Sequence, residues 1–191
     1  MTFDLLGEHE AADFRRAGHF AYEGGGHGDT WLALGLLFAD PRRLQHAAAR
    51  LACQLRRYEA DLVCGPLIGG ALVGQWIAHE LGLGFVYAEA RPPEGYAIPA
   101  ELHAAVSGRR AVVVDDVINA GSATLAGARA VESLGGRVVA AGALMVREGA
   151  TLDLTRRLGA PVEALVSLSW RVWPPPDCPL CRSGMAMTAI P

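Results

Sequence analysis

The chain has 191 residues, of which 51% are apolar and 19% charged, and its formal net charge is −3. A chain of this size and composition is expected to fold as one domain around a well-filled core, without a disulfide scaffold. The small negative charge gives no long-range attraction to nucleic acid or to a membrane surface. All 17 basic side chains are arginine, which excludes chemistry by a lysine Schiff base or a lysine nucleophile.

Membrane insertion and secretion are not indicated by the sequence. Every apolar run is interrupted before the roughly 18 residues of a membrane-spanning helix, and the first ten residues lack the basic stretch of a secretion signal. We therefore expect a cytoplasmic protein whose cysteines are thiols. Cys178 and Cys181 have the spacing of half a zinc site, but no second Cys or His pair with matching spacing accompanies them. The favoured interpretation is a structural turn in the tail, and a metal shared between subunits is the alternative.

The N-terminal quarter of the chain contains three predicted elements. Residues 9–17 have the spacing of a short amphipathic helix. Within residues 18–32, two short aromatic-bearing runs flank a glycine-rich turn, which indicates a hairpin. An Asp-Pro pair at 40–41 is a helix start, and apolar residues recur at helical spacing over 44–58. We expect this helix to pack on a sheet.

From residue 60 onward, predicted strands and helices alternate. This pattern predicts an α/β fold with a parallel sheet, right-handed crossovers and ligands at the carboxyl ends of the strands. A polar, proline-rich stretch from Arg91 to about residue 100 interrupts the alternation and is interpreted, together with the residues up to 107, as a lid. Strands are expected at 60–64, 85–89, 111–116, 137–146 and 162–168, and helices at 72–81, 101–106, 122–134 and 152–158.

Residues 111–124 join a buried strand to a helix through a turn of small residues. Asp115 and Asp116 lie at the expected end of the strand, and carboxylates there can accept hydrogen bonds from sugar hydroxyls or coordinate a divalent metal. Gly121 lets an anion approach the backbone, and the helix that begins at Ser122 offers free N–H groups. These features predict a sugar-phosphate site. An ordinary turn with solvated acids is the alternative, and a dinucleotide site is disfavoured because no G-x-G-x-x-G run follows a predicted strand.

A second glycine-bearing loop, Gly65–Gly70, also follows a buried strand and opens a helix. Its N–H groups can face a second anion, although taken alone it fits a plain strand–helix connection equally well. Two such loops at one edge of a parallel sheet favour the phosphate interpretation.

The segment Val113–Thr124, with two apolar residues, two acids and a small-residue turn, resembles the ribose-phosphate signature of the type I phosphoribosyltransferases. Residues 18–20, 27–31 and 178–181 look like the hairpin and tail of a bacterial branch of orotate phosphoribosyltransferase. The resemblance implies a Rossmann-like parallel sheet of about five strands flanked by helices, with an N-terminal hood. It implies a single domain over 1–191, with a core at 36–169 and hood and tail elements at 1–35 and 170–191. A homodimer in which each site borrows a loop from its partner is also implied.

The implied reaction transfers the 5-phosphoribosyl group of 5-phosphoribosyl 1-pyrophosphate (PRPP) to orotate, with Mg²⁺, in pyrimidine biosynthesis. Its products are orotidine 5′-monophosphate and pyrophosphate. By this resemblance, Asp115 and Asp116 hold the ribose hydroxyls and can help to hold the metal, and Arg147 meets the orotate carboxylate. The 5′-phosphate would lie against Asn119, Ala120, Gly121, Ser122 and Ala123, and the pyrophosphate against Gly69 and Gly70.

The segment Pro92–Leu102 departs from the family pattern, because it has no basic residue where the family's lid carries lysine or arginine. Losing one lid cation would cost about 2–4 kcal/mol of transition-state stabilisation. Arg91 and His103 flank the segment, and Arg91 is the expected catalytic replacement; His27 and His103 are otherwise interpreted as solvated loop histidines. Glu23 also departs from the branch's hairpin. Three hypotheses stay open: an orotate phosphoribosyltransferase, a binding or regulatory protein with weak or no catalysis, and a phosphoribosyltransferase for another nucleobase.

Overall fold

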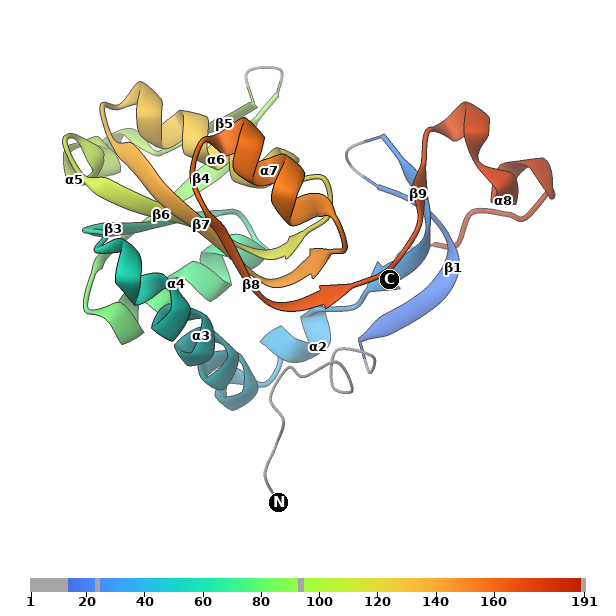
Figure 1. Ribbon diagram of the computed structural model, residues 1–191, viewed down its shortest axis with the longest axis horizontal. Coiled ribbons are helices and arrows are strands. Elements are labelled where there is room, and N and C mark those ends of the chain that lie inside the picture. The colour runs from blue at the N-terminus through green and yellow to red at the C-terminus, as the bar shows by residue number, and fades with distance from the viewer. Residues whose placement is uncertain (1–13, 23–24, 93–94, 190–191) are drawn as a thin grey trace.

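The structure, a computed structural model, describes residues 14–22, 25–92 and 95–189. In these ranges the chain forms a large sheet with helices on both faces and a smaller antiparallel sheet beside it (Figure 1). Glu23 and the residues 9–13 of the predicted first helix lie outside the described ranges. No helix among the described residues is both long enough and apolar enough to span a membrane.

The large sheet has the strand order β5-β4-β3-β6-β7-β8 within the described residues. Five neighbouring strands, β4, β3, β6, β7 and β8, pair in parallel, which confirms the predicted α/β fold. Strand β5 adds an antiparallel edge strand on β4. Part of the segment interpreted as a lid is therefore fixed to the sheet. The strands are β3 (Leu62–Pro66), β4 (Gly84–Arg91), β5 (Gly95–Ala97), β6 (Arg110–Ile118), β7 (Arg137–Arg147) and β8 (Val162–Leu168).

Helices cover the two faces of this sheet because the central strand β6 is apolar on both sides. Val112 and Val114 point toward α3 and α4, and Ala111 and Val113 point toward α6, as the two-residue period of a strand requires. Asp40 caps α3, as predicted, by accepting hydrogen bonds from two backbone N–H groups of its first turn. The helices are α3 (Pro41–Leu55) and α4 (Gly69–Leu81) on one face, and α5 (His103–Val106), α6 (Ser122–Ser133) and α7 (Ala150–Leu158) on the other. Short 3₁₀ turns lie at Arg56–Tyr58, Ala100–Leu102 and Pro175–Asp177.

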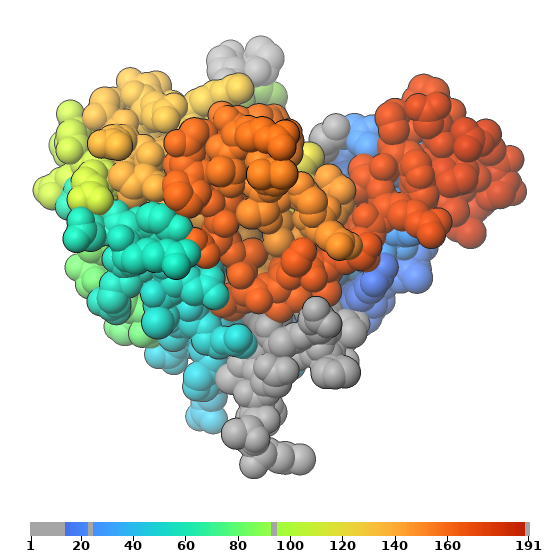
Figure 2. Space-filling model, in the orientation of Figure 1, coloured from blue at the N-terminus to red at the C-terminus, as the bar shows by residue number. Residues whose placement is uncertain are grey.

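The smaller sheet, here called the hood, has the order β1-β2-β9. It consists of β1 (Arg15–Ala21), β2 (His27–Leu32) and β9 (Val172–Trp173). With the tail helix α8 (Pro179–Arg182) it forms a lobe beside the core (Figures 1 and 2), and α2 (Gly35–Phe38) leads from the hood into the core. The hairpin predicted within 18–32 is confirmed.

The helix predicted over 9–17 is wrong where the structure describes it, since residues 15–17 lie in β1. Arg15 and Arg16 pair with Leu32 and Trp31 of β2. Cross-strand pairing and the burial of His19 and Phe20 outweigh the weak helical pattern of so short a segment.

Leu144 gives a test of this core, because its side chain is fully buried in the middle of β7. We expect Leu144→Ala to lower the free energy of unfolding by about 2–5 kcal/mol, through lost burial and the cavity that remains. Leu152→Ala is the matched control, because Leu152 on α7 is 61% exposed; its effect should stay within about 0.5 kcal/mol. Urea unfolding followed by circular dichroism measures both, and equal losses would contradict the placement of β7.

Candidate functional site

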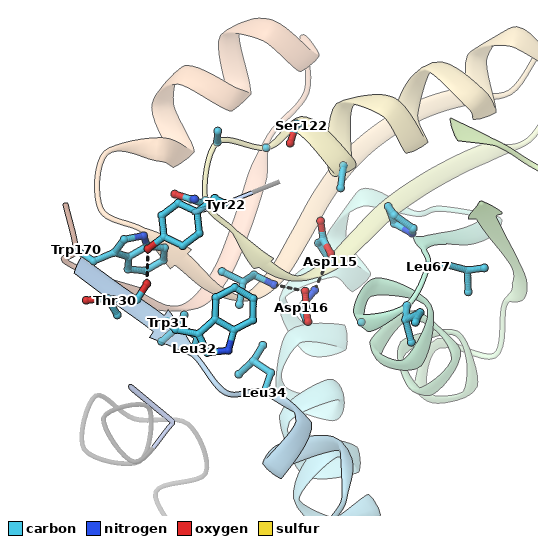
Figure 3. Close-up of a pocket in the computed structure, with 18 of the residues that line it drawn as sticks. Tyr22, Thr30, Trp31, Leu32, Leu34, Leu67, Asp115, Asp116, Ser122 and Trp170 are labelled. Atoms are coloured by element: carbon cyan, nitrogen blue, oxygen red, sulfur yellow. Dashed lines mark hydrogen bonds between the residues drawn. The ribbon is translucent and has the colours of Figure 1, made fainter. Parts of the chain in front are cut away.

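A pocket of about 500 Å³ lies between the carboxyl ends of β3 and β6 and the inner side of the hood (Figure 3). Three walls build it. The β3–α4 loop contributes residues 66–69, the end of β6 and the following loop contribute residues from Asp115 to Ala123, and the hood contributes Tyr22, Thr30 and Trp31. The two loops that the sequence marks as anion sites therefore open into one pocket.

The acid pair lies inside β6 and not at its last two residues, which corrects the predicted boundary. The strand expected over 111–116 continues to Ile118, because β6 pairs with β7 as far as Ile118 and Val146. Its pairing with β3 ends earlier, at Cys64 and Val113. The two acids thus follow the point where β3 separates from β6, and this opening is the floor of the pocket.

Asp115 and Asp116 are adjacent in a strand, so their side chains point to opposite faces of the sheet. Asp115 turns toward α6, where its Oδ2 accepts a hydrogen bond of 3.2 Å from the buried Thr124 hydroxyl, and its Oδ1 accepts from the Asp116 N–H at 3.0 Å. Asp116 turns toward the start of α4, and its Oδ1 accepts from the Val117 N–H at 2.7 Å. The Asp115 carboxylate therefore faces the start of α6, and the Asp116 carboxylate faces the start of α4.

Gly69 and Gly70 are required by this arrangement. A Cβ atom on Gly69 would lie 2.0 Å from Oδ2 of Asp116, and one on Gly70 would lie 3.1 Å from Oδ1 of Asp115. The loop reaches these glycines through Leu67 and Ile68, which are joined by a cis peptide bond. The absence of side chains at 69 and 70 lets the acid pair touch the backbone at the first turn of α4.

Burial governs the charge of the acid pair. It raises the pKa of the Asp115 carboxyl well above its ordinary value, and the neighbouring Asp116 raises that pKa further. Burial also raises the pKa of Asp116. Hydroxyl donors or a cation favour the charged form of a carboxyl, so a ligand that supplies either is well matched to the pair.

The loop from Asn119 to Ala123 curves around the pocket and is held from behind. Gly121 has a φ of 74° and directly precedes α6, and a Cβ there would lie 2.8 Å from a methyl carbon of Leu154, so both conformation and space demand glycine. Arg147 Nε donates to the Asn119 carbonyl at 3.3 Å, and Arg157 donates to the Ala120 carbonyl at 3.2 Å. The pocket-lining loop is thus fixed at the positive end of α6.

The residues of the hood that line the pocket were not predicted from the sequence. The Tyr22 hydroxyl donates to the Thr30 carbonyl, and burial raises the pKa of Tyr22 to about 12. Trp31 and Trp170 extend this wall, and Tyr96 of β5 contributes from the core. Such side chains offer flat apolar surfaces that suit a planar ring. Aromatic residues in the predicted hairpin were a signal, but only the docking of the hairpin shows which of them face the acids.

Some predicted site residues lie beside the pocket. Among the described residues, Gly70, Arg147 and Arg91 do not line it. Arg147, next to the hood, lies close enough to Tyr22 to lower that pKa slightly. Arg91 forms an exposed ion pair with Glu89 at 2.9 Å. His103 lies with its Nε2 3.0 Å from the Ile98 carbonyl oxygen, which gives it a structural contact. The remaining predicted residues, namely Gly69, Asp115, Asp116, Asn119, Ala120, Gly121, Ser122 and Ala123, all line the pocket.

No family model matches the chain. An orotate phosphoribosyltransferase from Methylobacterium sp. (strain 4-46) is 36% identical over 186 residues, covering 91% of this chain and 89% of the relative. Another, from Caldanaerobacter subterraneus subsp. tengcongensis, is 30% identical over 175 residues, covering 89% of this chain and 86% of the relative.

Solved structures share the fold. An adenine phosphoribosyltransferase from Thermoanaerobacter pseudethanolicus superposes with a TM-score of 0.68 at 25% identity, over 84% of this chain and 99% of that one. Orotate phosphoribosyltransferase from Mycobacterium tuberculosis H37Rv, in complex with PRPP, gives a TM-score of 0.60 at 21% identity, over 72% of this chain and 81% of that one.

The raised pKa values of the acid pair predict how stability varies with pH. Both carboxyls bind protons more strongly in the folded than in the unfolded chain, so their contribution to the free energy of unfolding falls as pH rises through the range between the two values. Asp116→Asn removes one charge and can still accept from the Val117 N–H. We expect the variant to be more stable than the parent at neutral pH, and the difference to shrink in acid. Urea unfolding at several pH values measures this, and parallel pH curves would contradict it.

Proposed function

The chain belongs to the orotate phosphoribosyltransferase family, and on this premise we propose that it transfers the 5-phosphoribosyl group of PRPP to orotate, releasing orotidine 5′-monophosphate and pyrophosphate. The observation that carries the proposal is the contact between the acid pair and Gly69–Gly70, because it joins two anion-binding loops in one pocket. PRPP has a phosphate at one end, a pyrophosphate at the other and ribose hydroxyls between them, in the same order as the groups of the pocket.

Each part of PRPP has a matching group. The 5′-phosphate would accept hydrogen bonds from N–H groups of residues 119–123 at the start of α6, and the Ser122 hydroxyl would add one. The ribose hydroxyls would donate to Asp115 and Asp116, while the pyrophosphate would lie at the start of α4, against Gly69. The Asn119 Oδ1 is buried and has no hydrogen-bond partner among the described residues, so it is available to a donor in the pocket.

Orotate would lie on the hood side of the ribose. Tyr22, Trp31 and Trp170 present flat surfaces there, and Arg147 lies beside Tyr22. Arg147 contacts the Asn119 carbonyl through Nε, so a bidentate bond to the orotate carboxylate would use its two Nη groups. The aromatic wall supports a planar base, and the arginine supports an anionic one.

In the proposed reaction a ring N–H nitrogen of orotate gives up its proton and bonds to the anomeric carbon as the bond from that carbon to the pyrophosphate oxygen breaks, and the departing pyrophosphate can take up the proton. The transition state has oxocarbenium character, so the protein acts chiefly by holding the two reactants in line and by favouring the departing charge. The N–H groups at the start of α4 would face that charge. Arg91 would join them after leaving Glu89, with which it pairs in this structure.

Mg²⁺ is the metal we propose for this site. The two carboxylates supply hard oxygen atoms next to the expected positions of the ribose hydroxyls, and such ligands suit Mg²⁺. When bound, the ion would offset the negative charge of the pyrophosphate. A cytoplasmic homodimer is part of the same proposal. The homodimer is supported by the exposed apolar residues Leu67 and Ile68 of the β3–α4 loop and Leu72 of α4, which a partner could cover.

A phosphoribosyltransferase for another nucleobase is the alternative, because the adenine phosphoribosyltransferase of T. pseudethanolicus shares this fold over nearly its whole length. Purified protein should be mixed with Mg²⁺, PRPP and either orotate, uracil or adenine; orotate loss is followed by absorbance, and nucleotide formation from uracil or adenine by chromatography. We expect turnover with orotate alone, and none after a chelator removes Mg²⁺. Turnover only with another base would refute the assignment of orotate, and binding of PRPP without turnover of any base would support a regulatory role.

The acid pair can be tested separately from the base. Asp115→Asn combined with Asp116→Asn should leave the protein folded, since amides fill the same space and remove a buried charge repulsion. Hydrogen bonds to charged groups are worth about 1.5–3 kcal/mol each, so PRPP affinity measured by calorimetry should fall by roughly a hundredfold or more.

Glu132→Gln is the control for this double variant, because Glu132 is an exposed acid near the end of α6 that does not line the pocket. Its PRPP affinity should match that of the parent. Undiminished binding by the double variant would refute the assignment of the ribose site.

A further inference from the structure

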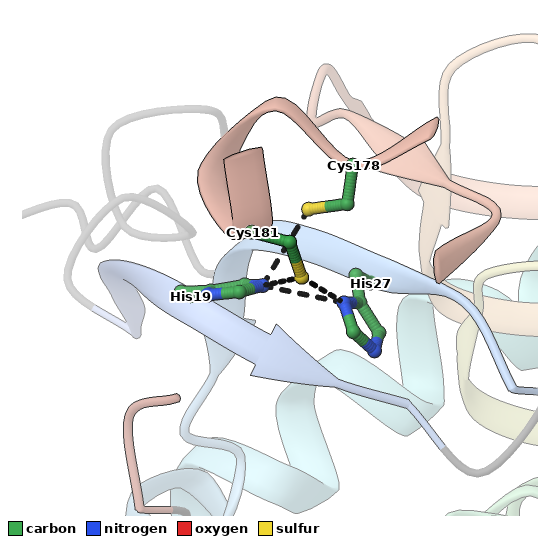
Figure 4. Close-up of side chains that lie close together, drawn as sticks. All are labelled: His19, His27, Cys178 and Cys181. Atoms are coloured by element: carbon green, nitrogen blue, oxygen red, sulfur yellow. Dashed lines mark hydrogen bonds between the residues drawn. The ribbon is translucent and has the colours of Figure 1, made fainter. Parts of the chain in front are cut away.

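A second cluster of reactive side chains lies outside the pocket, at the far side of the hood. His19 of β1 and His27 of β2 point toward Cys178 and Cys181 of the tail (Figure 4). We propose that these four residues bind one zinc ion, which fastens the C-terminal tail to the hood. Their ligand atoms all lie within 4.8 Å of one another.

The distances match a tetrahedral zinc site. Zinc bonds of about 2.0–2.1 Å to nitrogen and about 2.3 Å to sulfur place neighbouring ligand atoms roughly 3.3–3.8 Å apart around a tetrahedron. Nε2 of His19 lies 3.3 Å from Nδ1 of His27 and 3.5 Å from the Sγ atoms of both cysteines. Nδ1 of His27 lies 3.2 Å from Sγ of Cys181. Four of the six distances between ligand atoms are therefore at or close to the spacing that zinc requires, and the other two are within 4.8 Å.

Hydrogen bonds alone do not account for this convergence. The His19 Nε2 has three polar neighbours at 3.3–3.5 Å, yet a single imidazole nitrogen carries either one proton or one lone pair. Thiols are also weak hydrogen-bond donors and acceptors. One cation that accepts an electron pair from each of the four atoms satisfies all of them together.

The other nitrogen of His19 is also placed as a metal ligand demands. Its Nδ1 lies 2.8 Å from the Met185 carbonyl oxygen, which can only accept a hydrogen bond. The proton therefore belongs on Nδ1, and Nε2 faces the cluster with its lone pair. Ligand histidines commonly donate their second nitrogen to a carbonyl or carboxylate in this way, which fixes the ring.

The fold explains why these four residues meet. The pairing of β1 with β2 shifts between Ala17 and Phe20, and this irregularity falls at His19. Cys178 directly precedes α8, and the spacing to Cys181 returns its side chain to the same side of the turn. His19 and Cys178 are almost fully buried, and all four ligands come from one chain, so the donor set is closed, as in structural zinc sites.

This inference corrects two interpretations made from the sequence. The pair Cys178 and Cys181 is not merely a tail turn, and a metal shared between subunits is not needed, because the second pair of ligands is in the hairpin. His27 is not a solvated loop histidine. The histidine spacing differs from that of zinc fingers because the two side chains come from facing strands.

Zinc content gives the first test. Protein purified without a histidine tag from zinc-supplemented cells should contain one zinc per chain by elemental mass spectrometry. Cys178→Ser combined with Cys181→Ser should lose that zinc. Cys53→Ser is the matched control, because Cys53 is an exposed thiol on α3 outside the cluster, and this variant should keep it.

Cobalt gives a second readout that does not depend on a variant folding. Replacing zinc by Co²⁺ in the parent protein should give the visible absorption of tetrahedral cobalt and a thiolate-to-cobalt charge-transfer band. Removing the metal with a chelator should speed amide hydrogen exchange in residues 15–32 and 172–182, while β6 should be unaffected.

Four outcomes would overturn the proposal. They are a metal-free parent that takes up no Co²⁺, a different metal in the parent, a disulfide between Cys178 and Cys181 in protein kept reduced, and full zinc retention by the double variant. None of these depends on PRPP or on the base, so the zinc site and the proposed activity succeed or fail separately.

Discussion

Adjacent acids on one strand provide the organising contact of this molecule. Because Asp115 and Asp116 point to opposite faces of β6, the first reaches the start of α6 and the second reaches the start of α4. Two positive helix ends are thereby directed at one space from the two sides of the sheet. The contact depends on bare backbone at Gly69 and Gly70 and on the separation of β3 from β6 after Val113. Shifting the acid pair by one residue along β6 would turn each side chain to the opposite face of the sheet, and the pair would no longer contact the two loops in this way.

Burial of the pair has an energetic cost that a ligand can recover. The folded chain keeps two carboxyls in a place where their charges are unfavourable. Hydroxyl groups or a divalent cation would make the same charges favourable, so a ligand that supplies them can offset this cost. Carboxyls with raised pKa values of this kind cluster at functional sites.

The sequence predicted the core well because its signals there are local. A few neighbouring residues are enough to predict each of three features. These are the apolar run before the acids, the capped helix after Asp40 and the small-residue loop 119–123. The hood was predicted as a hairpin, but its pocket-facing residues Tyr22 and Trp31 were not, since their roles depend on how one sheet docks on another. The four-residue cluster was missed for the same reason. Residues 27 and 178 are brought together by tertiary structure, which no local spacing encodes, and the antiparallel strand β5 likewise depends on β4 as its template.

The pairing of β2 with β9 has a consequence for how the protein comes into being. The hairpin is made well before residues 172–181, yet those residues supply the third strand of the hood and two of the four clustered side chains. A nascent chain that has reached residue 168 already contains every strand of the large sheet and the acid pair. At that stage the chain has every strand of the core and both loops of the pocket, but the hood still lacks its third strand. Domains commonly fold in the order in which they are made, and here one part of a sheet is completed only by a strand made well after it.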